Sequence, residues 1–169
     1  MANTRFLSVA ALALLAAVAT PSFAKNDVQS IEGKWVMDNK NGKSAAEAPG
    51  HLAEEIKIDG NTLIIKSKYD QPQNGVYPLA WLGIMTEKLE LGMGGEETVN
   101  QIGPFRHVSK TTIDGSTVTT TWNATNDPGS VEGQWIRSLS EDGKTMTLQV
   151  KGKASDGRVI DNTVVFRRK

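Results

Sequence analysis

The feature that most constrains the fold of this chain is a series of tight-turn signals at short, regular intervals. Asp-Gly pairs stand at 59–60, 114–115, 142–143 and 156–157, and Asn-Asp-Pro-Gly occupies 126–129. Apolar and polar residues alternate between these turns. An Asp-Gly pair between two alternating runs is a strong hairpin signal, because the tight turn requires positive φ. Successive hairpins at this spacing predict an antiparallel up-and-down meander.

The alternation also predicts where most of the strands lie. We expect strands at residues 33–38, 52–58, 63–65, 105–113, 116–123, 131–139, 145–151 and 158–167. The segment 76–85 is apolar but is interrupted by Pro78 and Gly83, and 89–95 is loose and rich in glycine. Neither segment is predicted to form a long strand. In the sequence Ser-Ala-Ala-Glu at 44–47, an N-cap residue is followed by a carboxylate, as at the start of a helix. This pattern predicts a short helical turn after the first strand.

A meander of this length predicts a closed sheet. About eight to ten strands in one domain avoid exposed edges by closing into a barrel, and a barrel of that size is just wide enough for a small ligand. The predicted fold class is therefore all-β, a single antiparallel up-and-down β-barrel. Strand parity predicts an inward face containing Val118, Thr120 and Trp122; Met146, Leu148 and Val150; and Ile160, Val164 and Phe166. The same parity places Thr117, Thr119 and Thr121 on the outward face.

Residues 1–24 have the organisation of a secretory signal peptide. Arg5 supplies a positive start, 6–19 form an apolar and small-residue run, and 22–24 form a small-x-small cleavage site. The apolar run is shorter than the roughly 20 residues that a membrane-spanning helix needs. We therefore expect a leader at 1–24, a barrel domain at 25–169, and a periplasmic or secreted bacterial protein.

Charge and cysteine usage exclude several classes of partner. The chain has 19 basic and 19 acidic side chains and no cysteine. A near-neutral domain lacks the basic footprint of a nucleic-acid-binding or membrane-surface protein. Without cysteine the domain has no disulfide, and the leader is followed by no lipid-attachment residue, so we expect no membrane anchor in the mature form. No cofactor is predicted, and a protein partner is left open.

The first and last strands carry a family resemblance. Gly33-Lys34-Trp35, together with Arg167 or Arg168 near the C-terminus, resembles the lipocalin and calycin pattern. In that family the tryptophan closes one end of the barrel and a late arginine packs across it. The segment 35–44 also resembles the opening of exported bacterial lipocalin-like domains. The resemblance implies that Gly33, Trp35, Arg167 and Arg168 are structural, and that the barrel binds a small apolar or amphipathic molecule.

Residues that could contact such a molecule come from several segments. The candidates are Tyr77, Trp81, Ile84, Met85, Phe105, His107, Trp122, Trp135 and Arg137. The first four belong to the interrupted apolar segment, which is interpreted either as a lid over the barrel mouth or as an irregular buried strand. We expect Trp81, Ile84, Met85 and Trp122 to border one apolar cavity that opens at the end of the barrel opposite Trp35, with His107 or Arg137 as its polar contact.

The polar candidates have alternative interpretations. His107 lies on the same side of its predicted strand as Phe105, Ser109 and Thr111, so it is interpreted as an interior histidine. It is either hydrogen-bonded beside the Ser109 and Thr111 hydroxyls or used for acid–base chemistry. Arg137 either anchors a ligand carboxylate or ends its strand in water, because an unpaired buried arginine is costly. The acidic pairs at 54–55 and 96–97 are interpreted as solvated.

Three functions remain open from the sequence. The first is a non-enzymatic binding barrel, the second is a barrel enzyme that uses His107 with a nearby acid or hydroxyl, and the third is a side-chain-filled domain that meets another protein. No catalytic motif is recognisable, so no catalytic residue is assigned. His51 and His107 are the only histidines, and neither has metal-ligand spacing to a carboxylate, so no metal site is predicted.

Overall fold

The computed structural model describes residues 31–38, 50–70, 84, 86–127 and 129–169. Within these ranges the chain forms ten strands and no helix, and therefore no helix that could cross a membrane. The strands are β1 (Gly33–Met37), β2 (Leu52–Asp59), β3 (Thr62–Tyr69), β4 (Leu89–Gly92), β5 (Glu97–Ile102), β6 (Phe105–Asp114), β7 (Thr117–Thr125), β8 (Ser130–Leu139), β9 (Thr145–Ala154) and β10 (Val159–Arg168).

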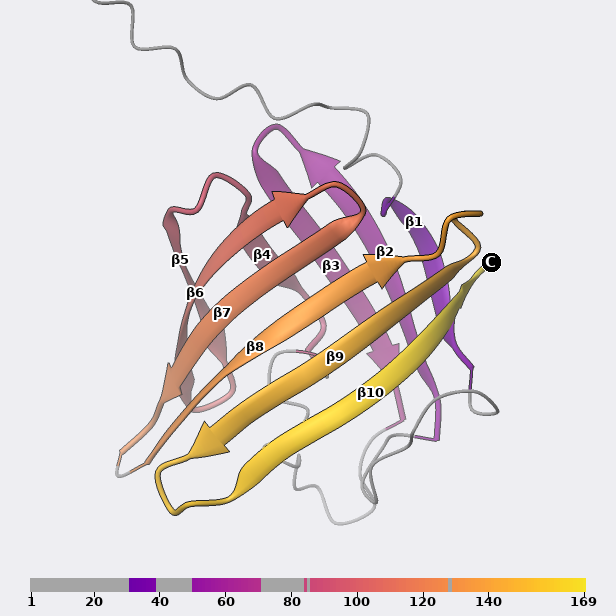
Figure 1. The fold of residues 1–169 in the computed structure, drawn as a ribbon. Coiled ribbons are helices and arrows are strands. Elements are labelled where there is room, and N and C mark those ends of the chain that lie inside the picture. The colour runs from indigo at the N-terminus through magenta and orange to yellow at the C-terminus, as the bar shows by residue number, and fades with distance from the viewer. Residues whose placement is uncertain (1–30, 39–49, 71–83, 85, 128) are drawn as a thin grey trace, which may run out of the picture.

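All ten strands belong to one antiparallel sheet. Their spatial order is β4-β3-β2-β1-β10-β9-β8-β7-β6-β5, so every pair of neighbours except β1–β10 is also consecutive in the sequence. The sheet wraps round so that β6 to β10 form one wall and β1 to β4 the wall behind it (Figure 1). The predicted all-β, up-and-down barrel is confirmed, at the upper end of the expected number of strands.

The predicted turns explain why the hairpins form where they do. Gly60, Gly115, Gly143 and Gly157 all have positive φ, which the second residue of each Asp-Gly pair was expected to supply. In the predicted turn at 126–129, the Asn126 amide donates a hydrogen bond of 2.9 Å to the Gly129 carbonyl. The strands that follow these turns match the predicted ranges to within four residues at either end.

The prediction of a loose segment at 89–95 is wrong for the first four residues, while 93–95 do form a turn. β4 occupies those first four residues, and β5 follows at Glu97–Ile102, a range in which no strand was predicted. β4 has only four residues, and it is held by pairing with β3, where Leu63 faces Leu91 and Ile65 faces Leu89. Such pairing comes from the tertiary fold and leaves a weak local signal. The leader, the helical turn at 44–47 and most of the interrupted apolar segment lie outside the described residues.

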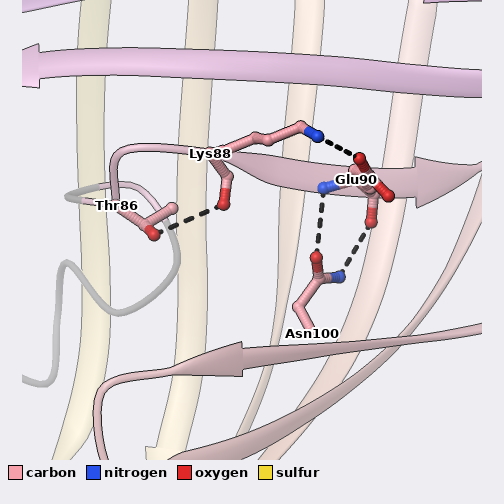
Figure 2. A network of polar contacts seen from close by, with 4 residues as sticks. All are labelled: Thr86, Lys88, Glu90 and Asn100. Atoms are coloured by element: carbon pink, nitrogen blue, oxygen red, sulfur yellow. Dashed lines mark hydrogen bonds and ion pairs between the residues drawn. The ribbon is translucent and has the colours of Figure 1, made fainter.

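β4 and β5 form the two edges of the sheet, and side chains connect them. Asn100 on β5 donates to the Glu90 carbonyl at 2.8 Å and accepts from the Glu90 amide at 3.1 Å, as a neighbouring strand would (Figure 2). The Gly92 amide donates to Thr98 Oγ1 at 2.8 Å. Lys88 forms an ion pair with the Glu90 carboxylate beside this contact (Figure 2). The barrel is therefore nearly closed, with a seam of side-chain bonds.

The first and last strands close the barrel as the family resemblance implied. Trp35 is fully buried, and the guanidinium carbon of Arg168 lies 4.5 Å from its ring centroid. Arg168 Nη1 also donates to the Glu32 carbonyl at 2.9 Å. A cation over an indole face gains electrostatic attraction in addition to packing. The predicted stacking of a C-terminal arginine on Trp35 is confirmed for Arg168.

Gly33 and Arg167 have supporting roles at the same closure. Gly33 has a φ of +142°, and a Cβ placed there would lie 3.1 Å from Arg168 Nη1. A larger residue would therefore disturb the arginine above Trp35. Arg167 points outward, where its Nε donates to Asp38 Oδ2 at 2.6 Å.

Candidate functional site

Most side chains on the inward face of the barrel are apolar, and a small group of them is polar or charged. The nine residues that parity placed inward on β7, β9 and β10 are all buried, while Thr121 is exposed and Thr117 and Thr119 are half-buried. The buried polar and charged residues among those described are Glu54, Ser67, His107, Ser109, Thr111, Thr120, Arg137 and Asn162. Thr111 and Thr120 hydrogen-bond each other at 2.9 Å.

Glu54 and Arg137 form a buried ion pair. Arg137 Nη2 on β8 donates to Glu54 Oε1 on β2 at 3.1 Å, and the two side chains are 1% and 0% exposed respectively. The sequence left open whether Arg137 binds a ligand carboxylate or ends its strand in water. The structure shows instead that it is buried with Glu54 as the acidic partner that a buried arginine needs. The expectation that Glu54 is solvated is wrong, since the period of a strand puts Leu52, Glu54 and Ile56 on one inward face.

Three rings from adjacent strands pack together on the inward face. His107 on β6 stacks on Trp135 of β8, with centroids 5.1 Å apart and an interplanar angle of 8°. Trp122 on β7 lies 5.7 Å from His107 and 5.3 Å from Trp135. A Cβ on Gly133 would lie 2.7 Å from Trp122 Cζ2, so only glycine leaves room for this ring. We call these three rings the aromatic cluster.

Several polar atoms of this inward face have no hydrogen-bond partner in the protein. In the described part of the chain, seven buried atoms accept or donate no hydrogen bond: Glu54 Oε2, Ser67 Oγ, His107 Nδ1 and Nε2, Trp122 Nε1, Trp135 Nε1 and Arg137 Nε. Native proteins leave few such groups, because each costs about 1–3 kcal/mol. An unpartnered set on one inward surface marks a place where water or a ligand supplies the missing bonds.

The surroundings of His107 keep it neutral. Burial lowers its pKa from 6.5 to about 4. The expected hydrogen bonds to Ser109 and Thr111 are absent, since Ser109 bonds the Thr98 carbonyl and Thr111 bonds Thr120. In the described part of the chain His107 has no acidic or hydroxyl partner, so the acid–base alternative gains no support from this geometry.

The lowered pKa of His107 predicts a pH dependence of stability. Between about pH 4 and 6.5 the unfolded histidine binds a proton that the folded one does not, so stability falls as pH falls through this window. The difference amounts to about 3 kcal/mol in the free energy of unfolding. Urea unfolding at both ends of the window should show this extra loss in the wild type but not in His107→Phe. Equal losses in the two proteins would contradict a neutral, buried His107.

The other sequence candidates divide into two groups. Ile84 is buried in the core, and Phe105 is half-buried and packs against it. Tyr77, Trp81 and Met85 lie outside the described residues, so a lid in this segment stays a prediction. Sequence reasoning missed Glu54 and its neighbour in the sheet, Ser67. Strand parity was the signal that could have identified both.

A groove with a volume of about 700 Å³, which we call the outer groove, runs over β1, β2 and β3. Outward-pointing side chains such as Lys34, Glu55, Lys66 and Lys68 line it, and its lining residues also include Trp35, Glu54 and Ser67 of the same three strands. Glu55 is already paired with Lys57 at 3.3 Å. The described residues include no group of three or more histidines or carboxylates that could hold a metal.

Comparison with known proteins identifies the fold. No protein-family model matches the sequence, and no curated protein matches it. A solved structure described as REP1-NXSQ fatty acid transporter matches with a TM-score of 0.55 and 16% identity, over 83% of this chain and 97% of that one.

Two further solved structures match this fold over a similar share of the chain. A mutant of the fluorescent protein UnaG gives a TM-score of 0.52 at 12% identity, covering 84% of this chain and 98% of that one. Secretory abundant heat soluble protein 4 from Ramazzottius varieornatus gives 0.51 at 11% identity, covering 82% and 94%. The chain therefore has the fold of the fatty-acid-binding and lipocalin-like calycin β-barrels.

Proposed function

We propose that this calycin-fold barrel binds one small apolar or amphipathic molecule in its interior, without catalysing a reaction. The observation that carries the proposal is the set of seven buried, unpartnered polar atoms on the inward face. An apolar wall with a few fixed polar groups is the usual form of a small-molecule site. The aromatic cluster supplies a large contact surface for the apolar part of a ligand.

Two further arguments support the proposal. One structural neighbour is described as a fatty acid transporter, and it shares nearly its whole length with this fold. The leader-like organisation of 1–24 also suits a protein that carries a molecule outside the cytoplasm. We propose on this basis that the mature chain works in the bacterial periplasm or after secretion.

The test is a titration with Nile red, a neutral apolar dye, followed by dye and tryptophan fluorescence. We expect saturable binding of one dye per protein, displaced by a long-chain alkyl compound. Trp122→Ala should weaken binding about tenfold or more, because it removes part of the aromatic cluster. Circular dichroism and urea unfolding would establish that the variant is folded.

Two surface variants are the matched controls. Lys153→Ala lies on the outside of β9, and Lys66→Ala lies in the outer groove. Neither should change the affinity for Nile red. A loss in Lys66→Ala with none in Trp122→Ala would assign binding to the outer groove and contradict an interior site. The absence of saturable binding by any apolar compound would refute the proposed function.

A further inference from the structure

The inward face of the barrel has a balanced charge. Glu54 and Arg137 are the only buried charged residues in the described part of the chain, and they lie 3.1 Å apart. The remaining buried polar residues are hydroxyls, one amide and the neutral His107. The positive charge of Arg137 is therefore already compensated before any ligand enters.

The ion pair nevertheless leaves one hydrogen-bond donor and one acceptor without a partner. Arg137 Nε is a free donor and Glu54 Oε2 a free acceptor in the described structure. The two indole N–H groups of Trp122 and Trp135 add donors, and Ser67 Oγ can both donate and accept. A ligand group that both donates and accepts hydrogen bonds matches this set better than a group that only accepts.

A ligand with a full charge would disturb the balance. A carboxylate at Arg137 would place two anions beside one cation inside an apolar wall, where repulsion is weakly screened and burial of a charge is costly. An ammonium group at Glu54 would create the opposite imbalance beside Arg137. A neutral head group has neither cost.

We propose that the barrel selects neutral amphipathic molecules, with a hydroxyl or amide head and an alkyl chain, over the corresponding carboxylate and ammonium ions. The selectivity comes from Glu54, because its carboxylate already pairs with the Arg137 guanidinium that an anionic ligand would otherwise bind. This inference rests on the proposed interior binding function and assigns the ligand class of that site.

The experiment compares four ligands with the same ten-carbon chain at neutral pH, each competing with Nile red. They are 1-decanol, decanamide, decanoate and decylammonium. On the wild-type protein we expect decanol and decanamide to bind roughly tenfold or more tightly than either ion. Binding of decanoate more tightly than decanol would overturn the inference but leave the binding function intact. Failure of all four to displace the bound dye would also overturn the inference, whereas the proposed function fails on a separate outcome, the absence of saturable binding by Nile red itself.

A substitution tests the assigned role of Glu54. Glu54→Gln keeps the size of the side chain and removes its charge, which leaves the positive charge of Arg137 uncompensated. Decanoate affinity should then rise about tenfold or more relative to decanol, since the anion now completes a pair. The matched control Glu55→Gln removes an adjacent, outward charge on the same strand and should leave the wild-type order unchanged.

An unchanged ratio in folded Glu54→Gln would overturn the assigned role of Glu54. If circular dichroism shows that this variant does not fold, the wild-type ligand series alone decides between neutral and charged head groups.

Discussion

Arg137→Met is expected to lower the free energy of unfolding by about 3–5 kcal/mol, because the change leaves Glu54 as a buried carboxylate without its partner. The side chain of Glu54 has no exposed surface, so solvent cannot replace the lost contact. Urea unfolding at neutral pH, followed by both fluorescence and circular dichroism, measures the effect.

The double variant Glu54→Leu/Arg137→Met is the control for this prediction. Replacing a buried ion pair with apolar side chains of similar size is often neutral or stabilising, because both charges escape desolvation. We expect the double variant to be more stable than Arg137→Met by at least about 2 kcal/mol. A single variant that loses less than about 1 kcal/mol would show that the pair is not buried in solution.

The second large effect is expected at the barrel closure. Trp35→Ala should reduce the free energy of unfolding by about 3–5 kcal/mol, as removal of a fully buried aromatic side chain does. The variant loses the indole packing, the bond from Nε1 to the Ile31 carbonyl at 2.9 Å, and the surface that supports Arg168.

Arg168→Met separates the packing of Trp35 from its contact with the cation. Methionine keeps an apolar side chain over the ring but removes the charge, so a smaller loss of about 1 kcal/mol is expected. Unfolding curves of the three proteins under the same conditions give the comparison. Equal losses in Trp35→Ala and Arg168→Met, or no loss in Trp35→Ala, would contradict the assigned closure.

Most of the fold could be predicted because its signals are local. Each Asp-Gly turn is encoded by two adjacent residues, and each long strand shows its inward face by alternation. β4 was missed because it is short and is stabilised by pairing with β3. Its Leu89 and Leu91 do alternate inward, but the surrounding glycines obscured that pattern.

The site could be predicted only in part. The alternation of side chains placed Trp122 and His107 on the inward face, and both are buried there. It left open whether Arg137 points inward or ends its strand in water, and the structure buries this side chain. The alternation of inward and outward side chains could not identify the ion-pair partner of Arg137. Glu54 lies 83 residues away in the sequence, and a carboxylate is normally assigned to the surface. The environment of His107 depends on the two indoles contributed by β7 and β8, which no local pattern around His107 encodes.

The central claim is that the ligand lies inside the barrel, and an isotope-filtered NMR measurement tests it most directly. With ¹³C-labelled 1-decanol bound to unlabelled protein, we expect nuclear Overhauser contacts from the alkyl chain to the indole protons of Trp122 and Trp135 and to the Leu148 methyl groups. Saturable binding with contacts only to outward residues such as Val36 and Lys66 would contradict the claim.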